Sequence, residues 1–97
     1  MSYEVVDSTI DAWVLKHRFT LYHEFGGRPA RFIYLSSGNE CCQISIEPPL
    51  LGEVLIHARD IETFEDEEMQ MDWKVLTVEL EHALENAVLA VKQWFDR

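Results

Sequence analysis

Histidine and cysteine are the side chains in this sequence best suited to catalysis or metal binding. No two of the histidines stand at the i, i+4 or short-loop spacing that zinc sites use. The two cysteines are adjacent, so a disulfide between them would close no useful loop, and an acidic chain does not activate a thiolate. We therefore expect no catalytic residues, no metal, no cofactor and no enzymatic activity. These residues are His17, His23, His57, His82, Cys41 and Cys42.

A run of carboxylates beside apolar residues, from Asp60 to Trp73, is the most distinctive chemical feature. No glycine follows Gly52, which excludes the EF-hand type of calcium loop. Charges that steer a partner, around apolar side chains that bind it, are typical of a protein interface, although a solvated charged loop has the same composition. We predict a partner-binding site formed by Asp60, Glu62, Phe64, Glu65, Asp66, Glu67, Glu68, Met69, Asp72 and Trp73.

The charge of the whole chain points to the same class of partner. Its 97 residues include 18 acidic and 8 basic side chains, for a formal net charge of -10. Such a field repels nucleic acids and anionic membranes and attracts a basic protein, although acidity also serves solubility alone. No apolar stretch approaches the roughly 18 residues of a membrane span, and the N-terminus lacks a secretory pattern. We expect a cytoplasmic protein.

The elements that position these residues begin with an ambiguous segment. From Trp13 to Phe25 apolar and polar residues alternate, which predicts a long strand. Ser8 and Asp11 also resemble a capping box, with Ile10, Trp13 and Val14 on one face of a short helix. Both interpretations of residues 8–16 remain open, and we prefer the strand.

Gly26 and Gly27 then predict a two-residue hairpin turn into a second strand over residues 28–36. In that register Phe25 faces Arg28, and two further pairs lie on the core side. These are Leu21 with Phe32 and Phe19 with Tyr34.

A second turn at residues 37–39 leads to a third strand, in which Cys42, Ile44 and Ile46 share a face. A fourth strand is expected over residues 53–61, followed by a loop over residues 61–73 with at most one helical turn. From Thr77 to Asp96 apolar residues recur at three- and four-residue steps, which predicts a helix. The prediction is one α+β domain over residues 1–97: an antiparallel four-stranded β-meander with a C-terminal α-helix packed on one face.

Four segments of the chain resemble small immunity proteins of bacterial toxin systems. They are RFIYLSS at 31–37, CQISIEPP at 42–49, IET at 61–63 before the acidic run, and Trp94 in the closing helix. The resemblance covers size, acidity and a strand-then-helix layout over most of the chain. It implies a bacterial cytosolic protein that binds and blocks a cognate toxin, often a basic nuclease. No site residue is carried over from it.

The leading hypothesis is therefore an inhibitor that binds a basic protein. The first alternative is a homodimeric structural or regulatory module that pairs through a sheet edge or the uncovered face of the sheet. A second alternative is a small-molecule-binding or catalytic domain that uses His23, His57 and a cysteine.

Overall fold

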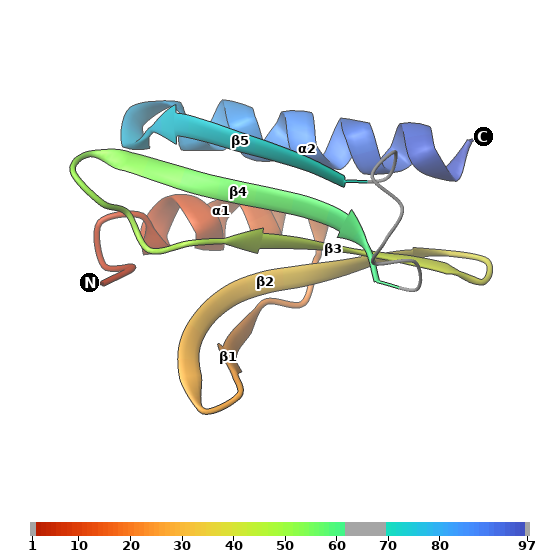
Figure 1. The fold of residues 1–97 in the computed structure, drawn as a ribbon, viewed down its shortest axis with the longest axis horizontal. Helices are drawn as coiled ribbons and strands as arrows, with labels where there is room; N and C mark the ends of the chain where they lie inside the picture. The colour runs from red at the N-terminus through yellow and green to blue at the C-terminus, as the bar shows by residue number, and fades with distance from the viewer. Residues whose placement is uncertain (1, 62–69, 97) are drawn as a thin grey trace.

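A computed structural model describes residues 2–61 and 70–96. In this part of the chain five strands form one antiparallel sheet in the order β1-β2-β3-β4-β5, and two α-helices pack on it (Figure 1). The fold is α+β, as predicted. The elements are α1 (Asp7–His17), β1 (Tyr22–Phe25), β2 (Arg28–Ser37), β3 (Glu40–Ile46), β4 (Glu53–Asp60), β5 (Gln70–Leu76), a 3-10 turn (Thr77–Glu79) and α2 (Leu80–Phe95).

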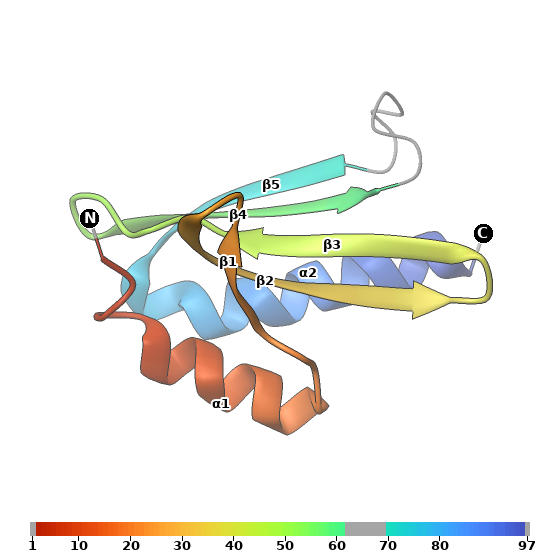
Figure 2. The same ribbon diagram turned by 90° about the horizontal axis from the view of Figure 1, so that it is seen from below.

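The first element is a helix, so the preferred strand over this segment is wrong. Ile10 and Trp13 are buried one helical turn apart, whereas Leu15, which a strand would place beside Trp13, is 80% exposed. The capping box does not form, because the N-cap is Val6 and it makes no side-chain cap bond. Packing against α2, beside which α1 lies in Figure 2, decides the conformation.

The first hairpin has the predicted turn but a different register beyond it. Phe25 pairs with Arg28 as expected, while Tyr22, not Leu21, lies opposite Phe32 because the register shifts between Tyr22 and Glu24. Such a bulge turns the preceding residues to the other face. Leu21 and Phe19 precede β1 and pack against the core under the helices, so their predicted pairing with Phe32 and Tyr34 is wrong.

The third and fourth strands alternate as predicted. Cys42, Ile44 and Ile46 of β3 are buried on the same face as Val54, Ile56 and Ala58 of β4.

A fifth strand replaces the end of the predicted loop, so the prediction of four strands is wrong. Residues 70–76 pair with β4, where Met71 lies opposite Ala58 and Trp73 opposite Ile56. The alternation of Met71, Trp73 and Val75 is typical of a strand, but it begins inside the acidic run, whose other residues show no clear period. Residues 62–69 lie outside the described part.

The C-terminal helix is confirmed and supplies much of the core. Its buried stripe packs on one face of the sheet, together with Ile10 and Trp13 of α1. Over residues 2–61 and 70–96, no helix is both long and apolar enough to span a membrane. The buried residues of α2 are Leu80, Ala83, Leu84, Ala87, Val88, Val91 and Trp94.

Candidate functional site

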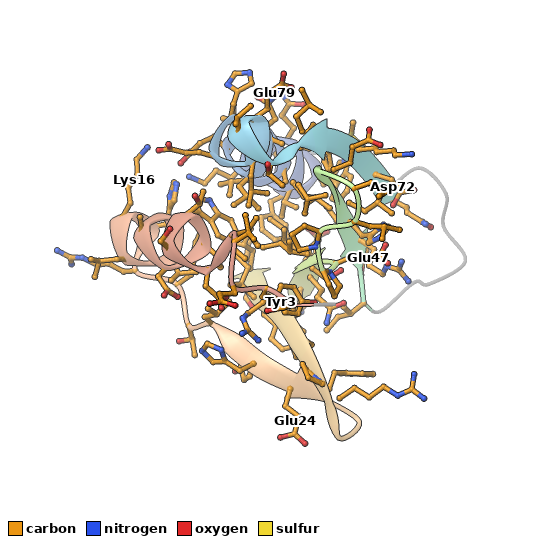
Figure 3. All side chains as sticks on the ribbon, turned by 90° about the vertical axis from the view of Figure 1, so that its left-hand side faces the viewer. Tyr3, Lys16, Glu24, Glu47, Asp72 and Glu79 are labelled. Carbon is orange, nitrogen blue, oxygen red and sulfur yellow. The ribbon has the colours of Figure 1, made fainter. Side chains whose placement is uncertain are left out.

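The candidate site lies on the face of the sheet opposite α1 and α2, here called the open face because no described element covers it. Figure 3 shows Glu47 and Asp72 on this side and Lys16 of α1 on the other. Strand register places two rows of side chains across it. One row is Tyr34, Gln43 and Arg59, and the next is Phe32, Ser45, His57 and Asp72.

Aromatic rings from the first hairpin cluster at one end of the open face. Tyr22 stacks on Phe32 with a centroid separation of 5.2 Å, and Phe25 and Tyr34 meet Phe32 edge-on at 6.0 and 5.6 Å. Phe32 is only 5% exposed beneath them. Edge-to-face and offset contacts at these distances are favourable, so the hairpin carries a small apolar cluster of its own.

A groove of about 550 Å³ opens beside this cluster. Its apolar lining includes Phe25, Phe32 and Tyr34, and its polar lining includes Gln43, Ser45 and Arg59. The volume is within the range of pockets that hold small molecules, and the combination of apolar walls with a few polar groups is typical of them.

The two arginines that line the groove are in different electrostatic states. Arg31 Nε donates to Asp7 Oδ1 at 2.8 Å, and its Nη1 donates to the Ala30 carbonyl at 2.7 Å. The guanidinium also lies 4.4 Å from the centroid of Tyr3, and the hydrogen bond to Asp7 raises the pKa of Arg31. Arg59, in contrast, makes no ion pair and no hydrogen bond from its side chain to any described residue.

The N-terminal segment forms part of the groove lining through Tyr3. The Tyr3 hydroxyl donates to the Ile46 carbonyl at 2.8 Å, and burial raises the pKa of Tyr3. The phenol therefore stays neutral and fixes the segment before α1 to the end of β3.

His57 is held between two carboxylates next to the groove. Its Nδ1 lies 2.6 Å from Asp72 Oδ1, and its Nε2 lies 2.5 Å from Glu47 Oε2. Both nitrogens donate only in the protonated ring. Burial alone would lower the pKa of His57, but the hydrogen bonds to Asp72 and Glu47 outweigh it and raise the pKa.

Ser45, His57 and Asp72 stand side by side on β3, β4 and β5, in the order of a Ser-His-Asp triad. In such a triad the histidine nitrogen far from the aspartate accepts the serine proton. Here that nitrogen contacts Glu47 Oε2 instead, so it is not placed to accept the proton of Ser45. This arrangement stabilises charge across three strands and does not activate Ser45.

Replacing His57 with glutamine is expected to destabilise the fold in a pH-dependent way. Since the folded pKa of His57 is raised, the stability contributed by its charge is fully present below the unfolded pKa of about 6.5 and is lost as pH rises through the folded value. Urea unfolding of both proteins from about pH 5 to 9 measures this: the difference in free energy of unfolding between wild type and variant should shrink as the pH rises.

The same substitution in a Glu47→Gln/Asp72→Asn background is the control, because the histidine charge then has no carboxylate partner. An advantage of the wild type that grows with rising pH would contradict this electrostatic role of His57.

The predicted partner-binding residues do not form one patch within the described part. Asp60 is 7% exposed and pairs across the strands with Cys42 on the helix-covered face. Trp73 is half-buried against the core on that face, and only Asp72 lies on the open face. Glu62, Phe64, Glu65, Asp66, Glu67, Glu68 and Met69 lie outside the described residues.

Sequence reasoning missed the groove because it placed Phe32 and Tyr34 in the core. Ile33 and Leu35 face the helices instead, so the two aromatic residues lie on the open face. The signal was available: residues 32–35 are apolar on both faces of the strand, which indicates a strand covered, or coverable, on both sides.

Two of the other residues considered for chemistry, Cys42 and His17, have structural surroundings, whereas His23 and His82 are exposed. Burial raises the pKa of the Cys42 thiol to about 12, which leaves it unreactive at neutral pH. His17 bonds Glu85 of α2 at 2.9 Å and stacks on Phe19. Among residues 2–61 and 70–96 no cluster of histidine, cysteine or acidic side chains is placed to hold a metal ion.

Comparison of the chain with protein families, with curated proteins and with solved structures finds no match.

Proposed function

We propose that the protein is a protein-binding inhibitor that docks a basic partner protein on the open face of its sheet, in the manner of immunity proteins that neutralise a toxin. The observation that carries this proposal is the uncovered sheet face with an aromatic-walled groove, opposite a face that both helices cover. Antiparallel sheets often leave one face to water, but that face is then polar. Here it holds Tyr22, Phe25, Phe32 and Tyr34.

The dimensions of the molecule agree with a standard protein interface. It measures 35 × 29 × 26 Å, and a stable complex buries about 800 Å² on each partner. Tyrosine, phenylalanine and arginine are the residue types enriched at the centre of such interfaces. The open face offers all three, with Arg59 beside the aromatic cluster.

The charge of the chain supports a basic partner. A net charge of -10 accelerates encounter with a positive protein and disfavours acidic competitors. The acidic run that includes Glu62, Glu65 and Asp66 contributes to this field, wherever it lies relative to the open face.

The test is capture of the partner with matched charge variants. Tyr34→Arg adds a positive charge on the open face, and Leu89→Arg adds the same charge at an exposed position of α2. Tagged wild-type protein and the Leu89 variant should capture one basic protein in near-equal amounts from a native-cell lysate at low salt. The Tyr34 variant should capture it at least about tenfold less, as expected for a central interface position.

Two outcomes would overturn the proposal. Equal capture by the Tyr34 variant would place the interface elsewhere. In the second outcome the tagged protein captures no partner and has the solution mass of a dimer, while the Tyr34 variant is a monomer. That result would identify the open face as the contact of a homodimeric module.

A further inference from the structure

We infer that the groove on the open face is a binding site for a small organic monocarboxylate with an apolar body. This goes beyond the proposed function and does not depend on a partner protein, since the groove is complete within one chain.

The apolar end of the groove is built before any ligand arrives. Phe32 is fixed by ring contacts on three sides, to Tyr22, Phe25 and Tyr34, and is 5% exposed. Side chains held in this way lose little conformational freedom when a ligand packs on them. An aromatic or branched aliphatic group therefore finds a preformed wall.

The polar end of the groove offers hydrogen-bond donors. Gln43 of β3 lies opposite Arg59 of β4 in the strand register, and Ser45 follows two residues along on the same face. None of these three side chains bonds another described residue, so their donors remain available. A guanidinium donates two parallel hydrogen bonds to a carboxylate, and amide and hydroxyl donors can add further hydrogen bonds.

Arg59 gives the groove a cation that can pair with an anion. Arg31 pairs with Asp7, whereas Glu47 and Asp72 share the single histidine His57, so one carboxylate charge remains beside the groove. Arg59 is the cation lining the groove that makes no ion pair with a described residue. In a protein with a net charge of -10, an uncompensated cation beside an aromatic wall is a specific complement for a carboxylate.

The size of the groove sets the size of the ligand. About 550 Å³ is in the middle of the range for small-molecule sites. A bicyclic or phenyl body with a short acid side chain fits that volume, and it would reach from Phe32 to the row that holds Gln43 and Arg59.

The experiment is a titration of isotope-labelled protein with indole-3-acetate, 3-phenylpropionate and 4-methylpentanoate, followed by amide chemical shifts at physiological ionic strength. At least one acid should bind saturably and shift the amides of Gln43, Ser45 and Arg59, while those of α2 stay unchanged. The matching neutral amide, such as indole-3-acetamide, should bind about tenfold or more weakly, since it cannot pair with a guanidinium.

Arg59→Gln should weaken binding of the acid about tenfold and leave binding of the amide unchanged. Arg28→Gln, at the exposed first residue of β2 and outside the groove, should change neither. The acid-against-amide comparison uses the wild type alone, so it stands even where a variant misfolds. Three outcomes would overturn the inference: no saturable binding of any of the acids at millimolar concentration, equal binding of acid and amide, or equal loss in the two arginine variants. Loss of partner capture alone would leave this result untouched.

Discussion

Trp13→Ala is expected to destabilise the fold by about 3–5 kcal/mol, whereas Leu15→Ala changes stability by no more than about 0.5 kcal/mol. Trp13 is 2% exposed and packs edge-on against Phe19, while Leu15, two residues later in α1, is 80% exposed. Truncation of Trp13 leaves a cavity in the core beside Phe19. Urea unfolding with matched baselines measures both differences.

The comparison discriminates between helix and strand in this segment. In a strand, Trp13 and Leu15 would share the core face, and both substitutions would cost several kcal/mol; that result would contradict α1. Trp13→Phe is the control for volume. Because Trp13 Nε1 is buried without a hydrogen-bond partner among the described residues, phenylalanine should cost less than about 1.5 kcal/mol, since it also removes an unsatisfied donor.

Phe32→Ala is expected to cost about 3–5 kcal/mol, although the residue lies on the face without helices. It is 5% exposed beneath Tyr22 and Phe25, so its removal takes the centre out of the aromatic cluster. Phe25→Ala, at the rim of the same cluster and 67% exposed, should cost less than about 1 kcal/mol. Thermal and urea unfolding give the two values.

Amide hydrogen exchange separates a local from a global effect of Phe32→Ala. The amides of β1 should lose more protection than those of β4, because the ring cluster fastens β1 to the sheet. Equal costs for the two phenylalanine substitutions would show that the open face is only a solvated surface, and would count against both a docked partner and a ligand in the groove.

The elements that sequence reasoning located correctly are those with local signals. Gly26 and Gly27 take positive φ angles of 60° and 80° in the turn, which glycine adopts without the clash of a Cβ atom. The alternation of Cys42, Ile44 and Ile46 and the helical stripe of α2 each follow from residues within one element. Such patterns need no knowledge of the rest of the chain.

The first helix could not be assigned in this way, because its residues satisfy two periods at once. Trp13 is buried in either conformation, and the burial of Ile10 together with the exposure of Leu15 distinguishes them. That exposure results from packing on α2, which lies about seventy residues further along. The register shift between Tyr22 and Glu24 likewise accompanies the packing of Phe19 and Leu21 against the core.

The candidate site could not be predicted from the sequence for a related reason. Its groove combines Phe32, Gln43 and Arg59, one from each of three strands, and it depends on which side of β2 faces the helices. A period-two pattern tells which residues share a face but not which face the helices cover. With apolar residues on both sides of β2, the pattern alone left that choice undetermined.

The order of the strands in the sheet, which equals their order in the chain, also bears on how the chain folds during synthesis. Each strand pairs with its predecessor as soon as it leaves the ribosome, so hairpins form over short loops with little loss of chain entropy. Although α1 is made first, the part of this face that α2 covers, with Ile44 and Ile56, stays bare until α2 emerges after β5. Nascent chains halted before α2 should therefore present an apolar sheet face to chaperones. Emergence of α2 should end that chaperone contact.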